Sequence, residues 1–304
     1  MAGALLLVAV LMIGCAPQPT GDADRSPGAR SPDEGELASP RLIETSQDLP
    51  DAYRPHPEFD LTIAQLREIV DNQPSAIREA IMAEPTVFLE YAIRLLPRSA
   101  YDLALVDKQN PLPTDYVPQD LLPLDRYADQ LILNREGLSL RAVIMPDLLA
   151  MVEAARQDGI QLDISSTYRS YDYQRNLFDY WVAELGQAEA ERVSARAGTS
   201  QHQLGTTLDF GSVTRAFAEH PAGVWLAEHA GRYGFSLSYP EGYEELTGYS
   251  FEPWHFRWLS RAGTQMEARY FDGIQQYFLE FWAQAEPLLR DACSGGSCRD
   301  TVQP

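Results

Sequence analysis

The sequence predicts an α+β fold, because strand-like and helix-like segments alternate along its second half. Residues 160–166 alternate between apolar and polar side chains, as in a strand with one buried face. Residues 146–157 repeat apolar side chains at helical spacing, with a proline at the start and Gly159 just past the end. With 304 residues, 45% of them hydrophobic, the chain is long enough to bury a substantial core.

The N-terminal part of the folded region is predicted to be helical. Residues 61–96 carry apolar side chains at three- and four-residue spacings. Pro74, Pro85 and Pro97 divide this stretch into short helices, because proline lacks the amide donor that a helix interior needs. Residues 107–125 are rich in proline and predict an irregular connector. We therefore assign residues 51–126 to a helical extension and a connector.

The α+β domain itself is predicted at residues 127–262. Strands are expected at residues 131–134, 138–140, 160–166, 206–210, 235–239 and 255–259. Helices are expected at residues 146–157 and 225–233, and after Ser170, whose hydroxyl can cap a first turn. Residues 263–292 predict a long amphipathic helix, followed by a cysteine-containing tail to residue 304.

The N-terminus predicts export. Residues 1–14 form an uninterrupted apolar run that ends directly before Cys15 and is shorter than the roughly 20 residues of a membrane-spanning helix. The pattern resembles a bacterial lipoprotein signal, which implies cleavage before Cys15 and a lipid on its thiol. The protein is then expected in the bacterial cell envelope, anchored to a membrane. A buried N-terminal helix is the alternative, disfavoured by the polar segment that follows.

The composition of the next segment predicts a tether. Residues 15–50 are rich in Pro, Gly, Ser, Asp and Glu, with hardly any aromatic or β-branched residues. Such a segment cannot bury enough apolar area to offset the entropy of ordering it, so we expect a flexible leash.

The two C-terminal cysteines fit an oxidising compartment. Cys293 and Cys298 are separated by Ser-Gly-Gly-Ser, a flexible spacer that lets the thiols close a small disulfide loop. Two free cysteines in the tail are the alternative.

The charge balance disfavours nucleic acid as a partner. The formal net charge is -20, and the sequence contains no basic stripe. Phosphate backbones would repel such a chain, so the acidity indicates a soluble surface.

Two separate segments of the sequence each hold one imidazole and one carboxylate. His202 falls in a turn, and Asp209 lies within an apolar strand, where a buried carboxylate is costly unless a cation compensates it. The alternative for Asp209 is a solvent-facing position on that strand. His255 follows Glu252 by three residues in an aromatic, extended segment, where both side chains can converge on one pocket. A hydrolytic zinc site needs three protein ligands, an open position for water and a base, and these four residues can supply the protein groups.

The order of these motifs resembles a known family. Ser-x-His-(x6)-Asp and then Glu-x-x-His, with Ser166-Thr-Tyr-Arg-Ser170 and Gln174 upstream, is similar to the VanY-type D-alanyl-D-alanine carboxypeptidases. That family belongs to a wider group of zinc peptidases with the VanX dipeptidases and the Hedgehog fold. The resemblance covers about residues 130–262. It implies a small antiparallel sheet with flanking helices that carries the site.

The resemblance also implies the roles of individual residues. His202, Asp209 and His255 would bind one zinc ion. Glu252 would be the catalytic base, and Arg169 would stabilise the developing oxyanion. The residues expected to line the site for the end of the peptide are Tyr168, Ser170, Gln174 and Ser200.

The activity implied is a zinc carboxypeptidase that removes the terminal D-amino acid from peptidoglycan stem peptides. The choice between a DD and an LD bond stays open, and a dipeptidase acting on free D-Ala-D-Ala is an alternative within the enzyme class. A zinc-stabilised wall-binding module without turnover is the alternative from another class. Glu252 speaks against that module, because a site that only binds needs no base.

Overall fold

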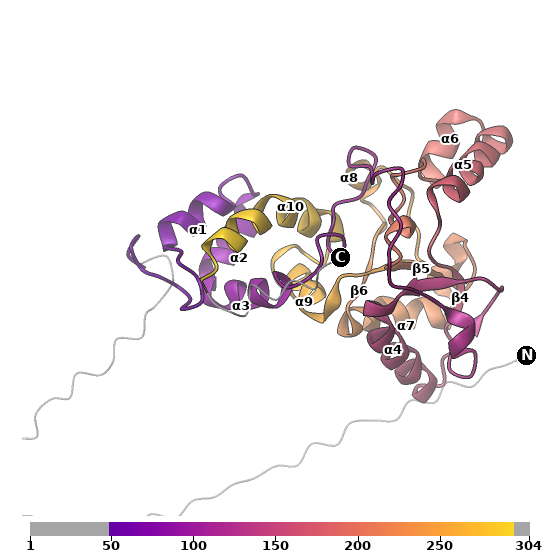
Figure 1. Ribbon diagram of the computed structural model, residues 1–304, viewed down its shortest axis with the longest axis horizontal. Coiled ribbons are helices and arrows are strands. Elements are labelled where there is room, and N and C mark those ends of the chain that lie inside the picture. The colour runs from indigo at the N-terminus through magenta and orange to yellow at the C-terminus, as the bar shows by residue number, and fades with distance from the viewer. Residues whose placement is uncertain (1–48, 295–304) are drawn as a thin grey trace, which may run out of the picture. The chain divides into compact units, whose positions relative to one another are not determined.

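The structure, a computed structural model, describes residues 49–294 (Figure 1). Cys15, the predicted signal segment, most of the predicted tether and Cys298 lie outside the described residues. The lipid anchor and the disulfide therefore stay predictions. Within residues 49–294, no helix is both long enough and apolar enough to cross a membrane.

A five-stranded sheet forms the centre of the α+β region. Its strands lie in the order β2 (Ile132–Leu133), β4 (Asp163–Ser166), β5 (Thr207–Phe210), β7 (His255–Trp258) and β6 (Phe235–Leu237). Neighbouring strands are antiparallel, except that β2 runs parallel to β4 at the edge. A separate antiparallel pair joins β1 (Leu121–Pro123) to β3 (Ser139–Arg141). The predicted α+β fold with a small antiparallel sheet is confirmed, with one parallel pair as a difference.

The two faces of the sheet have different environments. Leu208 and Phe210 of β5, together with Phe256 of β7, belong to a core shared with α4 (Met145–Gln157) and α7 (Pro221–His229). Because side chains alternate along a strand, Asp209 and His255 project from the opposite face. Helices α5 (Tyr171–Leu185) and α6 (Gln187–Val193) lie on the other side of the sheet from α4 and α7 (Figure 1).

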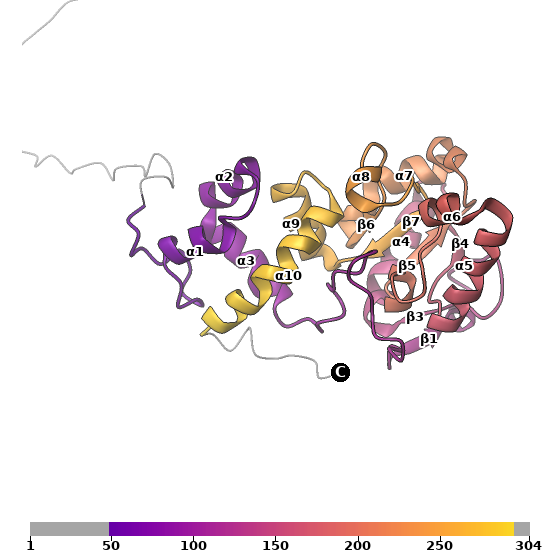
Figure 2. The same ribbon diagram turned by 90° about the horizontal axis from the view of Figure 1, so that it is seen from above.

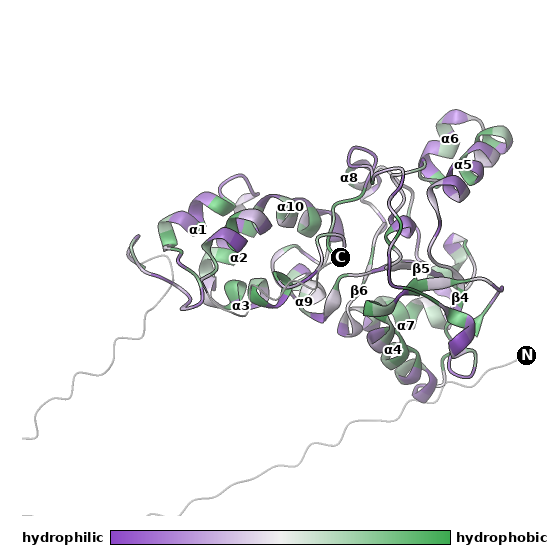
Figure 3. Ribbon diagram, in the orientation of Figure 1, coloured by the Kyte–Doolittle hydropathy of each residue, from purple (hydrophilic) through white to green (hydrophobic). Residues whose placement is uncertain are grey.

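The N-terminal helices pack against the C-terminal helices. The N-terminal helices are α1 (Ile63–Val70), α2 (Ser75–Ala83) and α3 (Pro85–Leu95), divided at Pro74 and Pro85 as expected. They share a core with α9 (Ser260–Tyr270) and α10 (Gln275–Ala292), in which the ring of Phe88 meets those of Tyr270 and Phe281 edge-on. Figure 2 shows α3, α9 and α10 as neighbours. Figure 3 shows that α1 and α10 carry both hydrophobic and hydrophilic residues.

Several elements differ from their expected bounds. The segment expected as one helix at residues 263–292 holds α9 and then the long C-terminal helix α10, because Asp272 and Gly273 have φ angles of 53° and 69°. A right-handed helix cannot continue through left-handed backbone. Helix α7 begins at Pro221, and residues 230–233 form a 3-10 turn. Strand β1 lies in the connector predicted to be irregular, whereas α6 and α8 (Glu244–Thr247) were not expected. The predicted domain boundaries stay predictions.

Candidate metal centre

Three segments bring two histidines and an aspartate together. Asp209 of β5 and His255 of β7 are directly opposite each other in the antiparallel register. His202 lies on a short 3-10 helix, η4 (Gln201–Leu204), just before β5. The hydroxyl of Ser200 caps η4 by accepting from the amide of His202, and Gly205, with a φ of 71°, ends it. A Cβ at Gly205 would lie 2.9 Å from the side chain of Arg141, so the turn favours glycine there.

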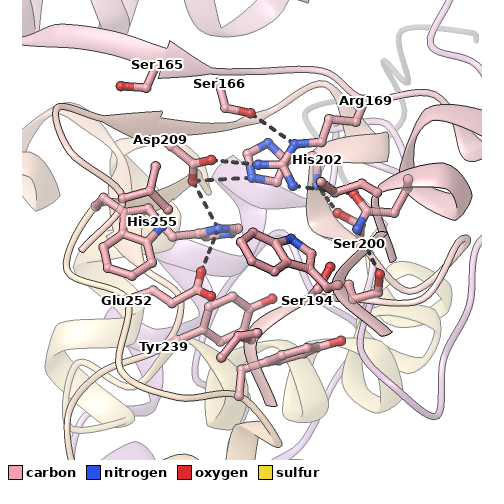
Figure 4. A pocket seen from close by; sticks show the side chains of 18 of the residues that line it. Ser165, Ser166, Arg169, Ser194, Ser200, His202, Asp209, Tyr239, Glu252 and His255 are labelled. Atoms are coloured by element: carbon pink, nitrogen blue, oxygen red, sulfur yellow. Dashed lines mark hydrogen bonds and ion pairs between the residues drawn. The ribbon is translucent and has the colours of Figure 1, made fainter. Parts of the chain in front are cut away.

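The candidate ligand atoms converge on one point. The Oδ1 atom of Asp209 lies 3.3 Å from His202 Nε2 and 3.3 Å from His255 Nδ1 (Figure 4). One ligand atom from each of the three residues lies within 4.8 Å of the others. All three side chains are buried. The structure thus brings His202, Asp209 and His255 close enough to share one ion.

Unpaired atoms at this point fit a metal ion. His202 Nε2 and Asp209 Oδ1 are buried and have no hydrogen-bond partner among the described residues. Buried polar atoms without a partner are costly and uncommon. Two imidazole nitrogens and one carboxylate oxygen are a donor set suited to zinc, and three protein ligands leave a position open. The residues present therefore fit a zinc ion.

Each imidazole is oriented by a contact on its far side. His202 Nδ1 lies 2.7 Å from the carbonyl oxygen of Thr167. A carbonyl only accepts, so Nδ1 carries the proton and Nε2 presents a lone pair toward Asp209. For His255 the order is reversed, because Nε2 lies 3.4 Å from Gln201 Oε1 and Nδ1 faces Asp209.

The charges around His202 and Asp209 suit metal ligands at neutral pH, whereas the pKa of His255, which burial alone would lower, is raised by the carboxylates of Asp209 and Glu252. Burial, with the nearby Arg169, lowers the pKa of His202 to about 4, so this imidazole is neutral. Burial alone would raise the pKa of Asp209, but the two histidines and Arg169 hold it well below its usual value. The aspartate is therefore ionised beside a neutral imidazole, and these are the protonation states that a metal ligand needs.

Glu252 lies beside the cluster in the position expected of a base. Its Oε2 is 3.3 Å from His255 Nδ1, and its side chain is only 13% exposed. Burial raises the pKa of the Glu252 carboxyl. The loop before β7 holds this residue through a hydrogen bond from its amide to the carbonyl of Tyr239.

Arg169 is bound to one of the candidate ligands. Its guanidinium donates to Asp209 Oδ2 at 2.7 Å, to Ser166 Oγ at 3.0 Å and to Gln174 Oε1 at 3.4 Å. The sequence suggested a role for Arg169 toward the substrate and gave no sign of this contact with Asp209. The oxyanion role stays a prediction.

The cluster opens into a cavity of about 310 Å³ (Figure 4). Of the four residues expected to contact the peptide, Gln174 and Ser200 line it, and Tyr168 and Ser170 are not among the lining residues. The Ser170 hydroxyl instead caps α5 by accepting from the amide of Tyr173. Trp254, in the aromatic segment expected around His255, also lines the cavity, and the lining aromatic side chains that the sequence did not indicate include Tyr173, Trp181, Tyr239 and Tyr249. No pattern marked them, because aromatic residues near strands are also typical of a core.

The fold corresponds to that of known peptidases. A solved structure described as the LdcB LD-carboxypeptidase, revealing the molecular basis of peptidoglycan recognition, superposes with a TM-score of 0.53 and 30% identity. The alignment covers 60% of this chain and 87% of that one. The VanXYg D,D-dipeptidase shares the fold at a TM-score of 0.51 and 24% identity, over 59% of this chain and 70% of that one.

Sequence comparison gives the family. Residues 137–261 match VanY, D-alanyl-D-alanine carboxypeptidase. A D-alanyl-D-alanine carboxypeptidase of Enterococcus faecalis (strain ATCC 700802 / V583) is 36% identical over 168 residues, 52% of this chain and 59% of the relative. The bifunctional D-Ala-D-Ala dipeptidase and D-Ala-D-Ala carboxypeptidase VanXYC of Enterococcus gallinarum is 30% identical over 175 residues. The alignment covers 54% of this chain and 86% of that relative.

The chain belongs to the VanY family of D-alanyl-D-alanine carboxypeptidases, as its motifs indicated. It spans between 51% and 66% of the length of three curated relatives.

Proposed function

We propose that this protein is a zinc carboxypeptidase, with one ion per chain, that removes the terminal D-amino acid from peptidoglycan stem peptides. The observation that carries the proposal is the buried cluster of His202, Asp209 and His255 beside Glu252, in which His202 Nε2 and Asp209 Oδ1 have no hydrogen-bond partner among the described residues. Membership of the VanY family supports the type of reaction. The cavity that opens onto the cluster gives a peptide end access to it.

The residues around the cluster can carry out the proton transfers of peptide hydrolysis. Zinc, when bound, lowers the pKa of its water toward about 7 and polarises a carbonyl group. Glu252 accepts a proton from the attacking water and later delivers it to the leaving amine. Its raised pKa, caused by burial, brings the carboxyl closer to the pH range in which both transfers are efficient.

Two further residues are suited to the substrate. The guanidinium of Arg169 lines the cavity, where its positive charge can stabilise negative charge that develops on the scissile carbonyl. The Ser200 hydroxyl accepts from the His202 amide, and its own proton has no acceptor among the described residues. It can therefore donate to the free carboxylate of the peptide.

A dipeptidase acting on free D-Ala-D-Ala is the second candidate, favoured by the likeness to the bifunctional relative of Enterococcus gallinarum. Incubating the purified protein with pentapeptide and tetrapeptide muropeptides and with D-Ala-D-Ala, and measuring released D-alanine by mass spectrometry, tests both activities. Release from the muropeptides supports the carboxypeptidase, and release from D-Ala-D-Ala alone supports the dipeptidase. No release from any of them would leave a binding module.

We also propose that the protein is exported and anchored to a membrane of the cell envelope through a lipid on Cys15. The apolar run before Cys15 supports this, and so does the polar segment after it, whose composition suits a leash to the folded region. Cys15→Ser should move the protein from the membrane fraction to the soluble fraction. A variant that still sediments with membranes would contradict the anchor.

A further inference from the structure

Helix α10 reaches the metal centre through two buried glutamines. Gln201 Oε1 lies 3.4 Å from His255 Nε2, the ring nitrogen that faces away from Asp209. Gln201 Nε2 donates to Gln275 Oε1 at 3.0 Å, and Gln275 Nε2 donates to the carbonyl oxygen of Ser236 at 3.3 Å. The exposed fractions of Gln201 and Gln275 are 3% and 1%. The contacts therefore form a continuous buried path from β6 to His255.

The orientation of the two amide groups is set by the carbonyl group of Ser236, at the end of the path. A backbone carbonyl can only accept, so the amide nitrogen of Gln275 must face Ser236 and its oxygen must face Gln201. Gln201 then has to donate toward Gln275, which leaves its own oxygen for His255. Ser238 supports the same arrangement, because its hydroxyl donates to Gln201 Oε1 at 2.7 Å. If the side-chain amide of Gln201 or Gln275 were reversed, two oxygen atoms or two N–H donors would face each other.

The path therefore fixes the orientation of the His255 ring. Nε2 of this ring lies against Gln201 Oε1, and the opposite nitrogen, Nδ1, lies 3.3 Å from Asp209 Oδ1, at the point where a metal would bind. An imidazole held in one orientation binds a metal more tightly than a free one, because less order has to be imposed on binding.

We propose that Gln275 is a positioning residue for the metal centre, acting on His255 through Gln201. This inference rests on the proposed zinc site. Gln275 lies in α10, beyond residues 137–261 that match the family. Helix α10 is in turn packed against the N-terminal helices in one core. The helical extension, for which the sequence indicated no chemistry, thereby helps to hold the helix that orders a ligand.

The neighbouring glutamine provides a matched control. Gln276 is also buried, at 7% exposure, and lies one position further along α10. Its amide nitrogen donates to Asp107 Oδ2 and to Glu280 Oε1, neither of which belongs to the path to His255. Gln275→Met and Gln276→Met therefore each remove a buried amide from the same helix turn, but only the first interrupts the path.

The test is the dissociation constant for zinc, measured on the full protein with zinc alone by competition with a chelator. Gln275→Met should weaken zinc binding by about 10–100-fold, the range seen when a contact behind a ligand is removed. Gln276→Met should bind zinc as the wild type does. Circular dichroism at the working temperature checks that each variant is folded.

Two further readouts separate positioning from a general structural effect. In the cobalt-substituted protein, the visible absorption bands should shift in Gln275→Met and not in Gln276→Met, because they report the ligand geometry. Gln201→Met should weaken zinc binding by itself, and adding Gln275→Met to it should cause no further loss, since the second residue acts through the first. Gln201→Met also keeps the test available if Gln275→Met does not fold.

Equal zinc affinities of Gln275→Met and Gln276→Met, or additive losses in the double variant, would overturn the positioning role and leave the carboxypeptidase proposal intact. A wild-type protein that binds no zinc would instead overturn the proposed function.

Discussion

Arg169 Nη2 lies 2.7 Å from Asp209 Oδ2, while Asp209 Oδ1 lies 3.3 Å from both His202 and His255. The two oxygens of one buried carboxylate therefore have different surroundings. The charge on Oδ2 is compensated by the guanidinium of Arg169. Oδ1 faces the two imidazoles and has no hydrogen-bond partner among residues 49–294. Because a buried charge needs compensation, Arg169 both stabilises Asp209 and fixes which oxygen is available to a metal.

This relationship predicts separable effects of two substitutions. Arg169→Met should lower zinc affinity, because Asp209 loses its partner, and should also reduce turnover by about 10²–10³-fold through loss of a charge that stabilises the oxyanion. Arg169→Lys keeps a charge but cannot bridge Asp209 and Ser166 with a planar fork, so it should retain zinc better than Arg169→Met does. Zinc content and the rate of D-alanine release measure the two effects. Unchanged turnover in Arg169→Met would remove the residue from the reaction.

Glu252→Gln should bind zinc and lose activity. The amide keeps the size of the side chain beside His255 but cannot accept the proton of water, so turnover should fall by at least about 10²-fold. Metal analysis and the muropeptide assay on the same preparation check both parts. A variant that holds zinc and still releases D-alanine at the wild-type rate would show that another group is the base.

His202→Ala should abolish stoichiometric zinc binding, because the cluster then keeps only two protein ligands. His220→Asn is the matched control: this exposed histidine caps α7 through its ring nitrogen, and asparagine preserves a cap. The control should bind one zinc ion per chain. If His202→Ala also binds one ion, a different set of ligands is responsible.

The stability of the protein should depend on Glu267 in a defined pH window. Burial raises the pKa of this α9 carboxyl to about 8, from 4.5 for an ordinary glutamate, so the folded protein holds a proton there at neutral pH. Stability associated with the neutral carboxyl is fully present below the unfolded-state pKa and is lost as pH rises through about 8, by at most about 1.4 kcal/mol per pH unit.

Glu267→Gln removes this titration, so its free energy of unfolding relative to the wild type should rise between pH 5 and pH 8.5. Urea denaturation at the two pH values gives the difference, and other titrating groups cancel in it. A difference that is the same at both pH values would show that Glu267 is ionised in the folded protein.

The sequence predicted the main elements because their signals are local. Pro74 and Pro85 divide the N-terminal helices, and residues 160–166 alternate as a strand must. The interruption between α9 and α10 was missed because apolar spacing continues across Asp272 and Gly273, although an Asp-Gly pair is a turn signal and both residues have left-handed backbone.

Part of the candidate site could also be predicted because its signals are local in the sequence. His202, Asp209, Glu252 and His255 are residue types that carry chemistry, in an order that resembles a family. The contact of Gln201 with Gln275 joins positions 74 residues apart, and nothing in the local sequence indicates it. The cavity aromatics, such as Tyr239, were missed because the same residues at the same spacing also build cores.

The central claim is that zinc at this cluster hydrolyses a D-amino-acid bond, and the most direct measurement is D-alanine release from a pentapeptide muropeptide. The wild-type protein should release one D-alanine per peptide, stop when a chelator removes zinc, and recover when zinc is restored. Release that continues at the same rate after zinc has been removed would contradict the account.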